Sequence, residues 1–177
     1  LFGLGEVVIT RILFEFAGST SKPIADNTAF DVAVEYTRSG QRGLVGIECK
    51  YTEPFSKDAY RRSEYEALFA RCGAFAPGDY QDLSSSRYNQ LLRTHLLAQA
   101  LREGQYDEVH TCLFSSEQDD SCRRVGREFL SRVKPLSQSQ FLMLSFADFI
   151  AHAQRQELGW PDREWTMRLW ARYCATG

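Results

Sequence analysis

Three residues on two neighbouring predicted strands carry the side chains that a metal-dependent hydrolytic site needs. Asp31 opens one alternating, β-rich stretch, and Glu48 and Lys50 stand two residues apart in the next. Side chains two residues apart in a strand point to the same face, so Glu48 and Lys50 share a face. Because a short hairpin joins the two strands, Asp31 is expected on that face as well. The pattern therefore predicts two carboxylates and an ammonium group that meet on one side of a sheet.

These residue types suit phosphodiester hydrolysis. Mg²⁺ prefers oxygen ligands and is usually held by one or two carboxylates together with water and substrate phosphate. Asp31, Glu48 and the backbone carbonyl of Cys49 are the predicted metal ligands, and Mn²⁺ is expected to substitute for Mg²⁺. Bound metal lowers the pKa of a coordinated water and neutralises charge that builds on the phosphate. Lys50 is predicted to orient or deprotonate the attacking water, or to stabilise the developing charge.

A Glu-x-Lys triplet alone is weak evidence, because charged residues are frequent and a surface strand with alternating charge contains one too. Three observations favour a site. The triplet follows the apolar run 44–47, Asp31 opens a hydrophobic strand on the matching face, and the hairpin spacing allows lateral contact. The neighbours Ala33 and Gly46 are small and are predicted to leave room for an ion and a substrate.

The elements that must position these residues follow from hydrophobic periodicity and turn residues. Strands are predicted over 12–16, 29–36, 44–52, 108–114 and 141–146, with a glycine-bearing hairpin turn at 37–43. Helices are predicted over 57–72, 84–102, 119–133, 147–158 and 163–174, the second of them capped by one of the serines at 84–86. Antiparallel hairpins followed by strand–helix–strand crossovers predict a single α/β domain over 1–177, with a mixed central sheet covered by helices.

Composition limits the function classes. The chain has 177 residues, a net charge of −2 and a pI near 6.0, which excludes a binder that relies on strong positive charge alone. The five cysteines lack the CxxC spacing of a zinc cluster, and their odd number fits a reducing cytoplasm. No apolar run approaches the ~20 residues of a membrane span, so no membrane partner is expected.

The segments 30–36 and 45–53, read with their acid, acid and lysine, resemble the PD-(D/E)xK nuclease superfamily. The run 47–53 and the later stretch 88–96 are similar to a bacterial branch described as restriction-endonuclease-like. The resemblance implies a restriction-endonuclease-like mixed central β-sheet flanked by helices, with Mg²⁺ as cofactor. It also implies an endonuclease that hydrolyses DNA, with a restriction or defence role. A homodimer would suit cutting of both strands.

The chain departs from the family pattern in two places. Phe30 stands where the motif name has proline, and Pro23 and Asp26 lie upstream, which makes Asp26 a rival for the first acid. Only residues 1–8 are available for the helix that often leads this fold, so a shortened helix is expected, with Glu6 as its sole acid. Two alternatives stay open. One is a catalytically weak protein of the same fold that binds nucleic acid or a protein partner, and the other is a metal-free interaction domain.

Several further residues are candidates for supporting roles. Gln90 and Arg93 share a face of a predicted helix and are candidates for nucleic-acid contacts, with a solvated helix face as the equal alternative. Glu6 and Glu35 are candidates to support the metal ligands, although an exposed strand carboxylate is the slightly favoured interpretation of Glu35. His95 is predicted to be structural, because a single helical histidine usually is.

Charged and aromatic side chains outside the motif complete the predictions. Glu53 and Lys57 follow the motif and are predicted to line the cleft. Solvated helix faces are the favoured reading, ahead of phosphate contacts, for Arg61, Arg62, Arg123, Arg124 and Arg127. Core packing or a dimer surface is favoured over base stacking for Trp160, Trp165, Trp170 and Tyr173.

Overall fold

A computed structural model describes residues 3–18, 27–134 and 140–175. The upstream rival acid, Asp26, and Pro23 lie outside the described residues. In chain order the elements are β1 (Val8–Phe16), β2 (Phe30–Arg38), β3 (Gln41–Lys50), α1 (Ser63–Cys72), the 3₁₀ helix η1 (Pro77–Asp79), α2 (Tyr80–Leu83), α3 (Asn89–Arg102), β4 (Glu108–Ser115), α4 (Asp120–Arg132), β5 (Phe141–Ser145), α5 (Phe146–Gln154) and α6 (Trp160–Tyr173).

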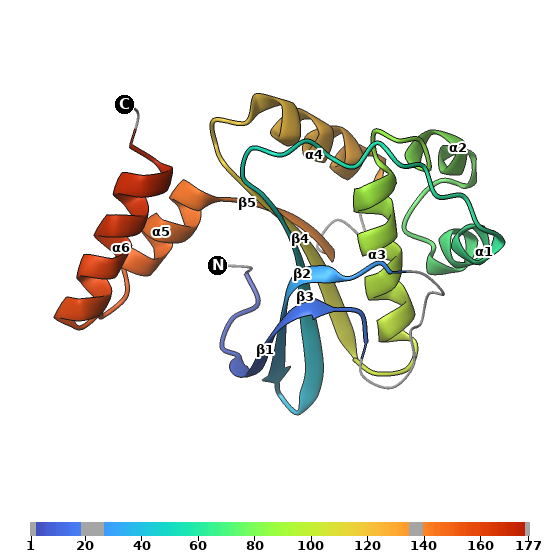
Figure 1. Cartoon of the computed structure of the whole chain (residues 1–177). Coiled ribbons are helices and arrows are strands. Elements are labelled where there is room, and N and C mark those ends of the chain that lie inside the picture. The colour runs from blue at the N-terminus through green and yellow to red at the C-terminus, as the bar shows by residue number, and fades with distance from the viewer. Residues whose placement is uncertain (1–2, 19–26, 135–139, 176–177) are drawn as a thin grey trace.

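The five strands form one sheet whose spatial order, β1-β2-β3-β4-β5, follows the order along the chain. The β1–β2 and β2–β3 pairs are antiparallel, whereas β3–β4 and β4–β5 are parallel. The parallel pairs need crossovers, which the helices between β3 and β4 and between β4 and β5 provide. The predicted α/β fold with a mixed sheet is therefore confirmed (Figure 1).

A two-residue turn sets the register of the β2–β3 hairpin. Ser39 and Gly40 both have positive φ angles, of 51° and 82°, and Arg38 pairs directly with Gln41. Two successive left-handed residues give the tight turn whose twist matches that of paired strands. The register places Val32 opposite Ile47 and so brings the start of β2 beside the end of β3.

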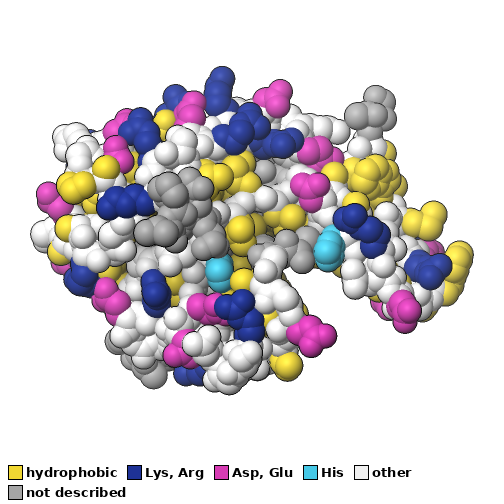
Figure 2. All heavy atoms as spheres, turned by 180° about the vertical axis from the view of Figure 1, so that it is seen from behind, with side chains coloured by type: hydrophobic (Ala, Val, Ile, Leu, Met, Phe, Trp, Pro, Cys, Tyr) yellow, Lys and Arg dark blue, Asp and Glu magenta, His cyan; other side chains and the backbone are white. Residues whose placement is uncertain are grey.

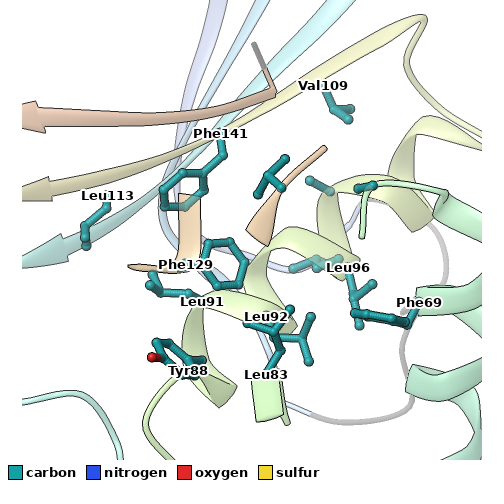
Figure 3. Packing of buried hydrophobic residues seen from close by; sticks show 14 of the residues in the cluster. Phe69, Leu83, Tyr88, Leu91, Leu92, Leu96, Val109, Leu113, Phe129 and Phe141 are labelled. Atoms are coloured by element: carbon teal, nitrogen blue, oxygen red, sulfur yellow. The ribbon is translucent and has the colours of Figure 1, made fainter. Parts of the chain in front are cut away.

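Helices α1, α3 and α4 cover one face of the sheet and enclose the main core (Figure 1). Helix α3 runs through the middle of this layer, with Leu91 and Leu96 almost fully buried against the sheet. Phe129 of α4 packs against Phe141 of β5, with ring centroids 4.9 Å apart (Figure 3). These contacts pack the helix layer tightly against the sheet and fix the position of this face.

The opposite face of the sheet is apolar as well but only partly covered. A smaller core of Tyr36, Val45 and Cys112 lies there, and residues 3–7 help to line an apolar hollow of about 530 Å³. Several large side chains of β1 remain in solvent, including Phe14 at 73% exposure. Helices α5 and α6 stand beside this face as a projecting pair, and Figure 2 shows the notch between them and the body.

Several predicted boundaries were wrong. Strand β1 starts at Val8 rather than residue 12, and residues 3–7 are not helical, so the expected leading helix is absent from the described residues. The helix predicted from residue 57 begins at Ser63. The helix predicted from residue 84 begins at Asn89, where no side chain caps it.

The late start of α1 has a physical cause in the structure. The backbone at residues 51–62 is held in an irregular path by side chains of α3. The Asn89 side chain bonds to both the backbone N–H and the carbonyl of Tyr60. The side-chain amide oxygen of Gln90 accepts a hydrogen bond from the backbone N–H of Ser56, 3.0 Å away. These bonds replace the helical ones that periodicity alone predicted. None of the described helices is long and apolar enough to cross a bilayer.

Candidate active site

Asp31 lies near the start of β2, where its side chain reaches across to β3. Its Oδ2 accepts a hydrogen bond of 2.7 Å from the backbone N–H of Cys49. Cys49 lies between Glu48 and Lys50 in sequence, so this bond holds the Asp31 carboxylate next to both. The hairpin register and one charge-assisted hydrogen bond together fix the first acid of the site.

Glu48 and Lys50 lie side by side at the end of β3 and are almost fully buried. Their side chains are 5% and 8% exposed, and the Lys50 Nζ is 3.1 Å from the Glu48 Oε1. The same Glu48 oxygen accepts a hydrogen bond from the Gln90 amide. The structure thus brings the predicted acid, acid and lysine together on the face that α3 covers. A metal-free interaction domain would require these carboxylates to be solvated on an open sheet face. The burial of Glu48 contradicts that alternative.

Burial dominates the electrostatics of Glu48. It raises the pKa of the carboxyl from 4.5 to about 7, and repulsion from Asp31 adds to the rise while Lys50 and Arg93 oppose it. A raised carboxyl pKa means that the site holds more negative charge than its surroundings stabilise. A cation placed between the two carboxylates would offset their negative charge and favour the ionised form of Glu48, as is expected of a metal site.

The donor set fits a hard divalent ion with part of its water shell. Asp31 and Glu48 offer carboxylate oxygens and Cys49 a backbone carbonyl, a set that suits Mg²⁺ or Mn²⁺. The Cys49 thiol is not a ligand candidate, because alternation along β3 directs it to the face opposite Glu48 and Lys50. Among the described residues, no three His, Cys, Asp or Glu side chains form a metal-binding group.

Gln90 and Arg93 extend the site from the first turns of α3. Gln90 links Glu48 to the 51–62 segment, because it donates to the carboxylate and accepts from the Ser56 backbone. The guanidinium of Arg93 lies 4.6 Å from the centre of the Tyr60 ring, and its buried Nε has no partner among the described residues. A buried donor without a partner is costly and suits an anionic group that binds next to the carboxylates. The alternative of a solvated helix face does not describe these two side chains.

Glu35 and Glu6 do not join the site. Glu35 is buried, contrary to the exposed alternative, and forms a two-point ion pair with Arg11 together with a 2.6 Å hydrogen bond from Tyr106. Burial acts to raise the pKa of Glu35, but the bonds from Arg11 and Tyr106 outweigh it and hold the pKa below 4.5. Glu6 is exposed, and its neighbours Leu4 and Val7 pack on the opposite face of the sheet. Their positions favour structural roles over support of the metal ligands.

The structure places His95 in the main core. Its ring is fully buried between Phe75 and Phe129, and its Nδ1 is 3.0 Å from the Thr111 hydroxyl. Burial lowers the pKa of His95 to about 4, so the imidazole is neutral near pH 7. A neutral side chain that is buried away from solvent does not contact a substrate, which agrees with the predicted structural role of His95.

Sequence periodicity missed the packing around the site. The ring of Phe30 was predicted on the opposite face but lies over Gly46, only 2.3 Å from where a β-carbon would sit. The space expected above Gly46 for an ion and substrate is therefore filled by this ring. The ring of Phe55 lies 5.6 Å from the Lys50 Nζ and shields the lysine. Phe30 directly precedes Asp31 and Phe55 lies five residues after Lys50, and strand periodicity interprets neither position.

Most of the outlying candidates are at the surface. Glu53 and Lys57 lie in the irregular 51–62 segment, and Arg61, Arg62, Arg124 and Arg127 are exposed, whereas Arg123 is half-buried and donates to the Glu117 carbonyl. Three tryptophans of α6, Trp160, Trp165 and Trp170, are 74%, 52% and 43% exposed. This exposure contradicts core packing, one of the two predicted roles, and the alternative of a dimer surface stays a prediction.

Comparison with known proteins agrees with the geometry. A family model described as the PD-(D/E)XK nuclease superfamily matches residues 1–175. The chain belongs to that superfamily, whose fold is the observed mixed sheet with flanking helices, and membership indicates nuclease activity on nucleic acid. Nucleases of this superfamily typically use divalent metals. No curated protein and no solved structure matches the chain.

Proposed function

We propose that the protein is a Mg²⁺-dependent endonuclease that hydrolyses DNA phosphodiester bonds, with a restriction or defence role. The observation that carries the proposal is the buried cluster of Asp31, Glu48 and Lys50, with the lysine ammonium 3.1 Å from the glutamate. A protein that only binds nucleic acid has no need to bury two carboxylates and an ammonium group together, because such burial costs stability.

Each residue of the cluster has a distinct task in this proposal. Asp31, Glu48 and the Cys49 carbonyl would hold Mg²⁺, which supplies an acidified water and neutralises charge on the phosphate. Gln90 fixes the orientation of the Glu48 carboxylate through its amide. Lys50 presents an ammonium group that orients the attacking water and stabilises the negative charge of the transition state. The Arg93 guanidinium, with its buried unpaired Nε, is placed to bind a phosphate oxygen of the substrate.

The direct test is cleavage of supercoiled plasmid and of single-stranded DNA with Mg²⁺ or Mn²⁺, with EDTA as the metal-free control. Lys50→Ala should abolish cutting, while Lys134→Ala, which removes an exposed lysine after α4, should cut as the wild type does. Circular dichroism checks that both variants fold. If the folded wild-type protein binds DNA but does not cut it under any of these conditions, the binding-only alternative holds instead.

A further inference from the structure

A polar pocket lies at the edge of the sheet where β3 and β4 end. It has a volume of about 420 Å³, within the range of small-molecule sites. Tyr51 and Thr52, which follow β3, form one wall, and Ser116 and Gln118, which follow β4, form another. The C-terminal end of α6 closes the pocket. Two separate parts of the fold therefore meet around this space.

The pocket directly adjoins the candidate active site. Lys50 and Ser115 are paired in the β3–β4 register, and the pocket walls begin with the next residue of each strand. Consecutive Cα atoms are only 3.8 Å apart. The Lys50 ammonium faces Glu48, whereas the Tyr51 ring contacts Phe146 and Tyr173 of the α5–α6 pair. The ends of β3 and β4 therefore place the pocket at the same edge of the sheet as Lys50.

The lining combines stacking surfaces with hydrogen-bonding groups. Tyr51 is 47% exposed, and its ring stands at 89° to that of Tyr173, with centroids 5.4 Å apart. Arg172 is exposed, lies 5.3 Å from the Tyr173 ring and forms no ion pair with a described residue. Gln118 and the Asp119 carboxylate add amide and carboxylate groups. Unstacked nucleobases bind to aromatic faces, to arginine, and to polar groups that hydrogen-bond with the edge of the base.

The larger hollow beside it does not have this chemistry. It measures about 770 Å³ and is lined by apolar residues such as Phe14, Phe149 and Trp165, with Arg172 and the hydroxyls of Tyr51 and Tyr173 as its polar groups. A nucleobase placed there would lose most hydrogen bonds of its polar edge, which is costly. The polar pocket alone offers both a stacking face and partners for that edge.

We propose that the pocket formed by Tyr51, Gln118, Arg172 and Tyr173 holds one unpaired nucleobase of a single-stranded nucleic acid, one or two nucleotides from the bond that is cut. The proposal rests on the proposed nuclease function and specifies its substrate as single-stranded or locally opened. Tyr51 supplies the stacking face, and Arg172 binds the adjoining phosphate or the base edge. Gln118 and Asp119 meet the polar edge of the base.

The test measures binding rather than cutting. Fluorescence anisotropy follows a labelled 12-nucleotide single strand in Ca²⁺, which occupies oxygen sites while slowing hydrolysis, and one base at a time is replaced by an abasic unit. In the wild type, loss of the base at one position should weaken binding by about 5- to 100-fold, the size of one aromatic stack. Tyr51→Leu and Arg172→Ala should weaken binding of the intact strand and abolish that position-specific penalty.

Arg168→Ala is the matched control, because Arg168 lies one helical turn away on α6 and pairs with Glu164 instead. It should keep the wild-type pattern. An even penalty at every position, or a peak that persists in both Tyr51→Leu and Arg172→Ala, would overturn the nucleobase pocket while leaving the nuclease proposal intact. A wild-type protein that neither binds nor cuts the strand or plasmid would overturn both proposals.

Discussion

Replacing Glu48 with glutamine should make the metal-free protein more stable while it destroys the site. Glutamine matches protonated glutamate in shape, so the variant reports the cost of the buried charge. The pKa of Glu48 rises from 4.5 to about 7, chiefly through burial. At 1.36 kcal/mol per pKa unit, Glu48→Gln should raise the free energy of unfolding by about 3 kcal/mol at pH 8.

The sign also predicts how this gain depends on pH. Between pH 4.5 and about 7 the folded protein holds a proton on Glu48 that the unfolded chain has released. The stability of the wild type therefore falls as pH rises through this window, while that of Glu48→Gln lacks this contribution. The difference between the two proteins should be small at pH 4.5 and largest above pH 7.

Urea denaturation in EDTA, at pH 5 and pH 8, measures both quantities. Glu157→Gln is the control, since it makes the same chemical change at an exposed position of the chain. Added Mg²⁺ should stabilise the wild type but not Glu48→Gln, because only the wild type keeps both carboxylates. A Glu48→Gln variant no more stable than the wild type at pH 8, or equally stabilised at both pH values, would refute the reasoning about buried charge.

Three further substitutions probe other parts of the structure. Glu35→Gln should cost about 1–3 kcal/mol at pH 7, because it weakens a buried charge-assisted network. Since the pKa of Glu35 is lowered, that cost should fade as pH drops below about 4.5, seen as converging melting temperatures. Gly46→Ala should destabilise by about 1–3 kcal/mol in urea, because its β-carbon meets the Phe30 ring, whereas Gly104→Ala, with open space around it, should not. Gln90→Ala should weaken Mn²⁺ affinity or cleavage by about 10- to 100-fold with unchanged secondary structure; wild-type titration curves would contradict its positioning role.

Strand alternation was sufficient to predict which motif residues meet. Asp31, Glu48 and Lys50 share a face because the hairpin and the period of two are local properties of the chain. The same reasoning failed for Phe30, since its ring turns at the strand end to fill the space that Gly46 leaves on the other face. Side-chain direction at a strand end depends on tertiary packing, which alternation does not contain.

The burial of the site was also beyond local patterns. Periodicity assigned the apolar residues of β2 and β3 to the core and the charged face to the opposite side. In the structure the opposite face is only partly covered, whereas α3 buries the charged face, so Glu48 and Lys50 lie deeper than most hydrophobic residues. Likewise, the start of α1 depends on bonds from Asn89, which is remote in sequence and therefore invisible to helix propensity.

The two halves of the sheet differ in the sequence distance that their pairings bridge, and this has a consequence for folding. The Asp31–Cys49 bond joins residues 18 apart, whereas Gln90 and Glu48 are 42 apart, and the bond from the Arg42 N–H to Asp107 beside the β3–β4 pairing spans 65. Closing longer loops costs more chain entropy, so the hairpin with its two acids can form before α3 and β4 arrive. The carboxylates are then still hydrated, and their charge becomes costly only when α3 docks. Docking of α3 is therefore the folding step at which the carboxylates lose their hydration and the cost of burying their charge appears.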